Sequence, residues 1–297
     1  MNVLVVGGSG FVGTTLSAEL VERGHDVTVL SRSPDDGDLP SGVETYAGDV
    51  TDYDDIEGAF EGQDAVVYLV ALSPLFKPKG GDEMHFEIHL GGAENVVAAA
   101  EEHGVDRLVH MSALGADPEG TTAYIRSKGE AEAVVRDSDL DWVIFRPSIV
   151  FGEGGEFVSF TLKLSPPGIA PLPGGGKTRF QPIHVADIAP MLADAIEDDA
   201  HVGETYEIGG PEVVTLADVA RLGRKAKGHP IAILPLPMAL AGVGLSIGEL
   251  IPGFPMGKDQ YRSLRLDNTV AENDVSAFGV DPAELRTLAE YLGVEQR

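Results

Sequence analysis

A tyrosine and a lysine, Tyr124 and Lys128, stand four residues apart in the run AYIRSKGEAEAVV. Residues four apart lie on one face of a helix, so the phenol and the ammonium can act on the same substrate. A phenol can give a proton to a carbonyl oxygen or take one from an alcohol, and a neighbouring ammonium lowers the pKa of that phenol. The pair therefore predicts proton transfer if the rest of the chain places a redox cofactor beside it. The alternative is an ordinary turn of a surface helix.

A glycine-rich turn follows the first apolar run of the chain and precedes a helical pattern. Its glycines can be grouped as Gly8-x-Gly10-x-x-Gly13 or as Gly7-x-x-Gly10-x-x-Gly13. A strand, a tight turn and a helix in this order place free backbone N–H groups, at the positive end of the helix dipole, against a pyrophosphate. The alternative is a glycine-rich turn that binds nothing. The contacts predicted for a dinucleotide in this turn are Gly7, Ser9, Gly10, Phe11, Val12 and Gly13.

The end of the second predicted strand indicates which dinucleotide binds. An NAD site usually has an acidic residue there, which accepts hydrogen bonds from the ribose hydroxyls. This chain has Ser31-Arg32-Ser33 instead. A guanidinium can bind a 2′-phosphate through two hydrogen bonds, and flanking hydroxyls can donate to it. We therefore predict NADP (NADPH) in preference to NAD, with Arg32 and Ser33 as contacts; the alternative is a loop arginine that faces solvent.

Four more residues are predicted to contact the cofactor. Asp49 follows the third predicted strand, where its carboxylate could accept a hydrogen bond from the adenine amino group. The alternative is that Asp49 is a turn residue, or that it caps the helix beginning at Tyr53. Val50, Ala71 and Pro147 follow the third, fourth and sixth predicted strands and complete the set.

Short β-branched runs alternate with helical patterns through the first half of the chain. Strict alternation of this kind produces right-handed βαβ units, so we predict an α/β fold with a doubly wound parallel sheet, the Rossmann arrangement. Strands are expected at Val3–Val6, Val27–Leu30, Glu44–Ala47, Ala65–Val70, Leu108–Met111 and Trp142–Phe145, and helices at 11–23, 53–60, 86–103 and 122–136.

The pattern changes after Arg146. Residues 152–176 are rich in glycine and proline and are predicted to form loops. We expect a dinucleotide-binding Rossmann domain and a smaller C-terminal substrate or lid lobe. The predicted boundaries are 1–150 for the first domain, to which 178–210 add a late strand and helix, and 151–177 with 211–297 for the lobe.

Composition limits the partners of the protein. The chain has 48 acidic and 21 basic residues, a net charge of -27, which repels nucleic acid and anionic membranes. The acidic residues are scattered, which favours a solvated surface suited to a high-salt cytoplasm over a partner-binding acidic tail. The chain has no cysteine, which excludes disulfides and thiolate chemistry. The apolar run at the N-terminus is too short for a signal peptide, so we predict a cytoplasmic protein.

One apolar stretch, Ile231–Gly248, has nearly the length of a membrane span. Pro235 and Pro237 interrupt it and would leave backbone groups that lipid cannot satisfy. A core or lid segment is therefore expected. The alternative is a peripheral membrane or protein-complex contact through 231–257.

The ordered motifs resemble the landmarks of the short-chain dehydrogenase/reductase superfamily. They are similar to its extended and atypical branch, which holds sugar-nucleotide epimerases and dehydratases. Within that branch the chain resembles the group of the nucleotide-binding accessory subunit of mitochondrial complex I. The resemblance rests on the glycine turn, on Tyr124-x-x-x-Lys128, and on the runs VHMSALGA (109–116), RPSIVFG (146–152) and PIHVADI (182–188).

The resemblance implies roles for three residues. Tyr124 would transfer the proton, Lys128 would hold the nicotinamide ribose, and Ser112 would orient the substrate oxygen while the nicotinamide passes hydride. One position departs from the family, which often has an asparagine where this chain has His89. That asparagine supports a water-linked proton path, so its loss puts efficient turnover in question. We expect His89 to be a helix-face histidine without a chemical role, with a proton relay as the alternative.

Three functions remain open. The first is an NADP(H)-dependent oxidoreductase that uses Tyr124 and Lys128 on a small-molecule substrate. The second is a non-catalytic NADP(H)-binding subunit or redox sensor of a respiratory or other complex. The third is a sugar-nucleotide epimerase or dehydratase, for which the basic residues of the tail show no spacing that identifies a diphosphate clamp. No pattern in the sequence predicts a metal site or identifies the substrate.

Overall fold

The computed structural model describes residues 1–34, 39–238, 258–263 and 265–295, and its packing forms two compact units. The second unit takes in 73–79 and the segments around 147–150, 178–184 and 207–210, which the predicted boundaries place in the first domain. Strand pairing explains part of this difference, because strands pair inside the second unit: β7 (Val150–Phe151) with β10 (Ile183–His184), and β9 (Arg179–Phe180) with β12 (Val214–Thr215). The first unit comprises Met1–Leu72, Gly80–Arg146 and Val185–Tyr206; the second comprises Ser73–Lys79, Pro147–His184 and Glu207–Arg297.

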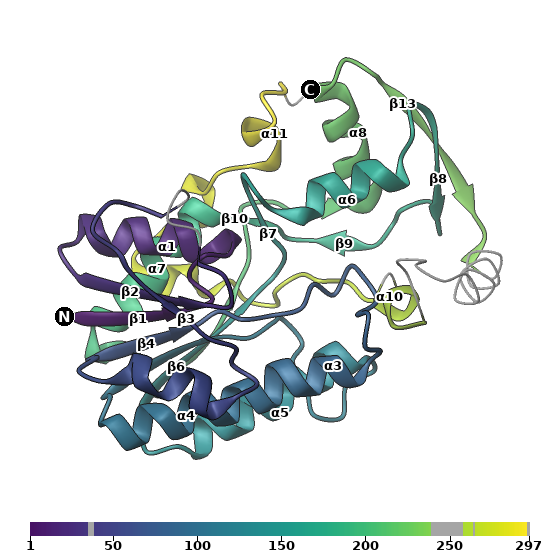
Figure 1. The fold of residues 1–297 in the computed structure, drawn as a ribbon. Helices are drawn as coiled ribbons and strands as arrows, with labels where there is room; N and C mark the ends of the chain where they lie inside the picture. The colour runs from purple at the N-terminus through teal and green to yellow at the C-terminus, as the bar shows by residue number, and fades with distance from the viewer. Residues whose placement is uncertain (35–38, 239–257, 264, 296–297) are drawn as a thin grey trace. The chain divides into compact units, whose positions relative to one another are not determined.

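A seven-stranded sheet with the order β11-β6-β5-β4-β1-β2-β3 forms the centre of the first unit (Figure 1). The pairs from β6 to β3 are all parallel, which confirms the predicted doubly wound α/β fold. The strand order reverses between β1 and β4, and ligands bind outside the carboxyl ends of the strands at such a point. The strands are β1 (Asn2–Val6), β2 (Asp26–Ser31), β3 (Glu44–Ala47), β4 (Ala65–Tyr68), β5 (Arg107–Met111), β6 (Asp141–Pro147) and β11 (Thr205–Ile208).

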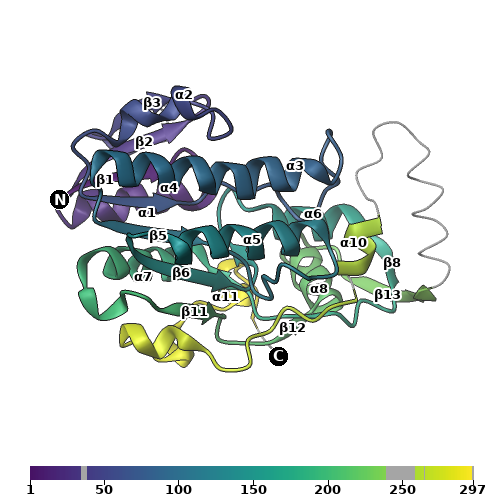
Figure 2. The same ribbon diagram turned by 90° about the horizontal axis from the view of Figure 1, so that it is seen from below.

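Helices cover both faces of this sheet. Helices α1 and α7 lie on one face, and α4 and α5 lie on the other (Figures 1 and 2). Residues Val3 to Val6 of β1 are completely buried, as a strand covered on both faces requires. The helices of this unit are α1 (Phe11–Glu22), α2 (Tyr53–Ile56), η1 (Glu57–Phe60), α3 (Glu83–His85), η2 (Phe86–Gly91), α4 (Gly92–His103), α5 (Ala123–Asp137), α7 (Val185–Glu197) and η3 (Asp199–His201).

The helix predicted over 86–103 is not uniform. Its first six residues form the π-helix η2, and the α-helical pattern begins only at Gly92. A π-turn holds one more residue than an α-turn, and such turns are frequent at functional sites. Tyr68 of β4 donates a hydrogen bond of 2.9 Å to the carbonyl of Ile88 within η2, which ties the turn to the sheet.

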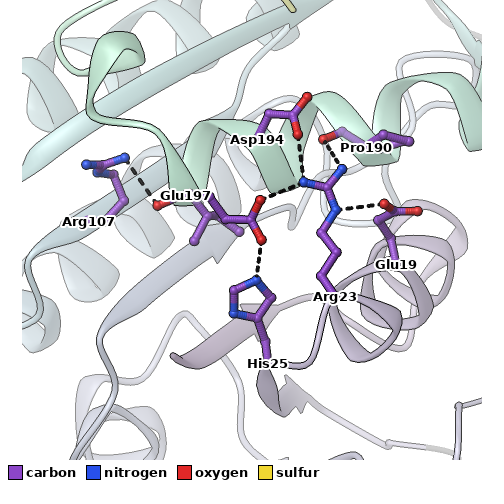
Figure 3. A network of polar contacts seen from close by, with 8 residues as sticks. Glu19, Arg23, His25, Arg107, Pro190, Asp194 and Glu197 are labelled. Atoms are coloured by element: carbon purple, nitrogen blue, oxygen red, sulfur yellow. Dashed lines mark hydrogen bonds and ion pairs between the residues drawn. The ribbon is translucent and has the colours of Figure 1, made fainter.

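Two arginines hold α7 in place: Arg23 ties it to α1 through ion pairs, and Arg107 ties it to β5 through hydrogen bonds (Figure 3). Arg23, which follows α1, donates to the carboxylates of Glu19, Asp194 and Glu197 at 2.6 to 2.8 Å. Arg107 of β5 donates to the backbone carbonyls at the C-terminal end of α7, the nearest being that of Ala195 at 2.9 Å. A helix end leaves its last carbonyls without intrahelical partners, so this buried guanidinium acts as a C-terminal cap.

The prediction that residues 152–176 form loops is wrong. They contain helix α6 (Glu156–Leu164) and strand β8 (Gly168–Pro173), which pairs in parallel with β13 (Ile231–Leu236). Glycines on both sides of α6 hid its helical spacing, in which Phe157, Phe160 and Thr161 are buried on one face. The other elements of the second unit are β7 (Val150–Phe151), β9 (Arg179–Phe180), β10 (Ile183–His184), β12 (Val214–Thr215), α8 (Leu216–Ala226), α10 (Lys258–Ser263), η4 (Asp274–Phe278), η5 (Pro282–Glu284) and α11 (Leu288–Tyr291).

Only 231–238 of the predicted contact segment 231–257 lie within the described residues. There, Ile231 and Ile233 pack against the core of the second unit, whereas Ala232, Leu234 and Pro235 are exposed. Among the residues that the structure describes, every helix is too short or too polar to cross a membrane.

Candidate functional site

The glycine turn has the geometry of an anion cradle. Gly7 has a φ of +88°, which favours glycine, and a Cβ on Gly13 would lie 2.5 Å from both Gly7 O and Gly8 Cα. A Cβ on Gly10 would meet only Gly7 O, at 3.2 Å, so the turn is open on that side. The first N–H groups of α1 lack intrahelical partners, its first turn has no acidic residue, and its N-cap, Gly10, offers no side chain to bond them. These residues fit a pyrophosphate.

An open pocket of about 470 Å³ adjoins this turn and is lined by Ser9, Ser31, Arg32 and Ser33. Arg32 and Ser33 are exposed. Within the described part of the chain, the Arg32 guanidinium makes neither a hydrogen bond nor an ion pair. A pocket that gathers one unengaged guanidinium and three hydroxyls suits a phosphate group.

Lys128 lies at the carboxyl edge of the sheet with its side chain buried. Its Nζ donates a 2.9 Å hydrogen bond to the carbonyl of Met111, the last residue of β5. Burial lowers the pKa of Lys128 to about 8, and the nearby carboxylate of Glu132 opposes this shift. The ammonium is therefore still mostly charged at neutral pH, and α5 holds it at a fixed point beside the end of β5.

Tyr124 lies one helical turn before Lys128 and is half-buried. Burial raises the pKa of its phenol to about 12. The shift is thus opposite to the lowering expected from Lys128, and burial is its cause. The ring stands nearly perpendicular to the rings of His85 and His89, at centroid distances of 5.7 and 5.4 Å. The phenol is thus protonated at neutral pH and fixed in orientation.

Ser112 follows Met111 directly and is 5% exposed. Its backbone N–H donates to Phe145 O at 2.7 Å, which extends the pairing of β5 with β6 by one residue. Its Oγ, although buried, has no hydrogen-bond partner among the described residues. A buried hydroxyl without a hydrogen-bond partner is suited to bind an oxygen of a ligand, and this one lies next to the carbonyl that Lys128 contacts.

His89 lies inside this cluster and not on an exposed helix face; that it has no chemical role stays a prediction. Its side chain is completely buried, and both ring nitrogens are engaged. Nε2 accepts a hydrogen bond from the backbone N–H of Leu72 at 2.9 Å, and Nδ1 lies 2.9 Å from Ser127 Oγ. The π-turn in η2 was not visible in the sequence, because glycine and apolar residues in the run FEIHLGG fit an α-helix equally well.

The remaining predicted cofactor contacts are spread around this edge of the first unit or beyond it. Asp49 forms a turn, in which its Oδ1 accepts from the backbone and hydroxyl of Thr51, and the helix at Tyr53 is capped by Asp52. The side chain of Val50 is buried in the core. Ala71 is exposed, and Pro147 ends β6, is buried and belongs to the second unit. A role for these four residues in cofactor binding stays a prediction.

A second buried histidine, His110 of β5, escaped the sequence interpretation. It stacks on Tyr68 with ring centroids 5.4 Å apart, and neither ring nitrogen has a hydrogen-bond partner among the described residues. Burial and the charge of Lys128 hold its pKa well below the usual range, so His110 is neutral. The same causes lower the pKa of His89. Groups of three or more possible metal ligands do not occur in the described ranges.

These two histidines predict a loss of stability in mild acid. Their folded-state pKa values lie below the unfolded value near 6.5, so the unfolded chain binds more protons as the pH falls below 6.5. Each histidine should lower the free energy of unfolding by about 1.4 kcal/mol per pH unit between about pH 6 and 5. Carboxylates titrate mainly below this window. Urea unfolding at pH 7.5, 6.0, 5.5 and 5.0 measures the slope.

His110→Phe is the matched variant for this effect. Its ring can stack on Tyr68, and the substitution removes no hydrogen bond that His110 makes to a described residue. The variant should show about half of the wild-type slope in this pH window. An unchanged slope in the variant would show that His110 is not buried in its neutral form.

Comparisons with known proteins identify the family of this chain. A family model described as NAD(P)H-binding matches residues 7–199. The chain is 28% identical to NADH dehydrogenase (ubiquinone) 1 alpha subcomplex subunit 9, mitochondrial, of Arabidopsis thaliana, over 93% of this chain and 73% of that protein. It is 30% identical to the 2-alkyl-3-oxoalkanoate reductase of Stenotrophomonas maltophilia, over 77% of each.

A solved structure shows the same relationship. The UDP-glucose 4-epimerase of Thermus thermophilus in complex with NAD is 26% identical, covers 80% of this chain and 86% of its own, and has a TM-score of 0.67. The chain therefore belongs to the NAD(P)H-binding family and has the epimerase/dehydratase-like fold of the short-chain dehydrogenase/reductase superfamily, with subunits of complex I among its relatives.

Proposed function

We propose that this protein is an NADPH-dependent reductase of a small carbonyl compound. Tyr124 gives the proton to the carbonyl oxygen, Lys128 holds the nicotinamide ribose, and Ser112 orients the substrate. The bound dinucleotide supplies the hydride. The observation that carries the proposal is the placement of these residues at one edge of the sheet. Lys128 Nζ donates to the carbonyl of Met111, the residue before Ser112. Lys128 lies one helical turn after Tyr124 on α5.

The resting protonation state of the phenol favours a role as proton donor. Burial raises the pKa of Tyr124 to about 12, so the group holds its proton at neutral pH. Its Oη has no hydrogen-bond partner within the part of the chain that the structure describes, so the proton is free for a ligand. A protonated phenol is a proton donor, which suits reduction of a carbonyl better than oxidation of an alcohol.

The test is turnover together with the identity of the bound nucleotide. NADPH and NADH oxidation should be followed with a panel of aldehydes, ketones and 3-oxo acids, the last chosen because a 30% identical relative is named for such a substrate. Native mass spectrometry of the purified protein should find NADP(H). Binding of neither nucleotide would overturn the proposal.

The cofactor preference gives a prediction for Arg32. Arg32→Ala should weaken NADPH binding roughly 10- to 100-fold, because it removes charge-assisted hydrogen bonds of about 1.5–3 kcal/mol to the 2′-phosphate. NADH lacks that phosphate and serves as the matched ligand, so its dissociation constant should change less than about twofold. Titration calorimetry measures both. Equal weakening of the two ligands would show that Arg32 does not contact the 2′-phosphate.

A second candidate function is a non-catalytic NADP(H)-binding subunit of a membrane complex. The match to the complex I subunit over 93% of this chain favours it, as does His89 in place of the family's asparagine. This candidate predicts nucleotide binding without turnover on the panel, and copurification of a tagged copy with respiratory proteins from the source cells. Turnover by the isolated protein would exclude it.

A sugar-nucleotide epimerase is less well supported. Such an enzyme needs cations that grip a diphosphate, and the basic residues of the tail show no spacing that identifies such a clamp. In the second unit, Arg224 donates to the carbonyls of Ser165 and Leu162, and Arg221 pairs with Asp218. Arg224 and Arg221 are therefore already engaged in contacts within the protein. Interconversion of UDP-glucose and UDP-galactose by the purified protein would nonetheless favour this function over a reductase.

A further inference from the structure

We propose that His89 is a positioning residue that clamps the backbone after β4 to helix α5, and so fixes Tyr124 relative to the glycine turn. It acts as a neutral ring with its proton on Nδ1, and it does not relay protons. The inference rests on the proposed function, because it names the residue that orders the same site.

The hydrogen bonds around the ring determine its tautomer. The backbone N–H of Leu72 can only donate, so the Nε2 atom 2.9 Å from it must accept and carries no proton. In a neutral ring the proton is then on Nδ1, which donates to Ser127 Oγ at 2.9 Å. Ser127 in turn donates to the backbone carbonyl of Tyr124 at 3.0 Å. The chain of donors therefore runs in one direction, from Leu72 to Tyr124.

The clamp reaches the glycine turn through the residues that follow β4. The N–H of Leu69 donates to Val6 O at 2.9 Å, and a Cβ on Gly7 would lie 3.1 Å from Val70 Cγ2 and 3.2 Å from Val70 N. Gly7 is thus in direct contact with the segment that ends at Leu72. An unbroken set of contacts connects the predicted phosphate site with the phenol.

A relay role conflicts with this arrangement. Both nitrogens of His89 are engaged, so a proton could pass only if one hydrogen bond broke and the ring became charged. The titratable groups that face His89 are His85, His110 on β5, and Tyr124 and Lys128 on α5. The cation among them, Lys128, disfavours a charged ring. The ring is therefore suited to hold its neighbours in a fixed position, and it also packs against the ring of Tyr124.

The tautomer is tested directly by nitrogen-15 NMR of the full chain labelled at histidine. The resonances of His89, assigned by comparison with His89→Leu, should show Nδ1 protonated and Nε2 unprotonated, without change from pH 5.5 to 8.5. An Nε2-protonated ring, or a titration within this range, would overturn the proposal.

Three variants test the clamp itself through amide hydrogen exchange at Leu72. Glutamine reaches as far as Nε2 and can still accept from Leu72, whereas asparagine reaches only to the position of Nδ1 and can serve Ser127. Exchange at Leu72 should be about tenfold faster in His89→Asn and His89→Leu and nearly unchanged in His89→Gln. Equal exchange in all three variants would overturn the proposal.

Ser127→Ala provides a variant that keeps the histidine and removes the other end of the clamp. It should leave Leu72 protected but weaken NADPH binding up to about tenfold, because α5 is no longer tied to the segment after β4. Unchanged NADPH affinity in both Ser127→Ala and His89→Leu would overturn the positioning role. If the wild type bound no NADPH, the proposed function would fail, while the tautomer and the Leu72 exchange would still decide whether the clamp exists.

Discussion

Replacement of Tyr124 by phenylalanine is expected to reduce carbonyl turnover by roughly 10²- to 10⁴-fold, the range associated with a general acid. NADPH affinity should change less than about threefold, because the phenyl ring keeps its contacts with His85 and His89 and loses only Oη. Steady-state kinetics and calorimetric titration on the same preparation measure the two quantities.

Tyr291→Phe is the matched control for this substitution. Tyr291 is 40% exposed and lies in α11 of the second unit, so its variant should keep both turnover and affinity. If Tyr124→Phe lost turnover and NADPH binding in the same proportion, Tyr124 would be a binding or structural residue, and the assignment as proton donor would be wrong.

The second large effect is expected at the glycine turn. In Gly13→Ala the new Cβ would lie 2.5 Å from Gly7 O and from Gly8 Cα, so the turn must shift. Overpacking of this kind costs about 1–3 kcal/mol, and we expect a comparable loss of unfolding free energy with NADPH binding weakened roughly 10- to 100-fold. Urea unfolding and titration calorimetry measure the two losses.

Gly10→Ala separates stability from binding. Its Cβ would meet only Gly7 O, at 3.2 Å, so the unfolding free energy should change by less than about 1 kcal/mol. NADPH binding should still weaken, because the methyl group would stand where a phosphate approaches. In the control Gly91→Ala the Cβ would be 3.9 Å from its nearest neighbour, Phe86 O, and both properties should be kept. Wild-type affinity in Gly10→Ala would place the pyrophosphate elsewhere.

The sheet of the first unit was predictable because its signals are local. Strands such as Val3–Val6 are continuous apolar runs, and Gly104, with a φ of +68°, ends α4 where the sequence indicates a cap. Helix α6 was missed because its apolar spacing is short and lies between glycines. Its stability comes from packing of Phe157 and Phe160 in the tertiary structure, which local sequence does not report.

The site was predictable to the extent that spacing defines it. Tyr124 and Lys128 share a helical face, and Ser112 ends a strand, so all three could be named from the sequence. The raised pKa of Tyr124 could not, because it depends on how far α5 is buried. The position of His89 depends on a π-turn and on the backbone N–H of Leu72, which is 17 residues away and carries no side-chain signal.

The π-turn has a consequence for how this gene can change. Because η2 holds one residue more than an α-helical segment of the same span, deletion of a single codon within 86–91 would let it close into a regular α-helix. Residues outside the turn would keep their faces, because the extra residue is accommodated within the turn, whereas residues inside it would change theirs. Such an in-frame deletion would move the His89 ring out of the interior and would leave the codons for Tyr124, Lys128 and Ser112 unchanged. Among homologous genes, a one-codon gap at this position would indicate proteins that lack the hydrogen bonds of the buried histidine.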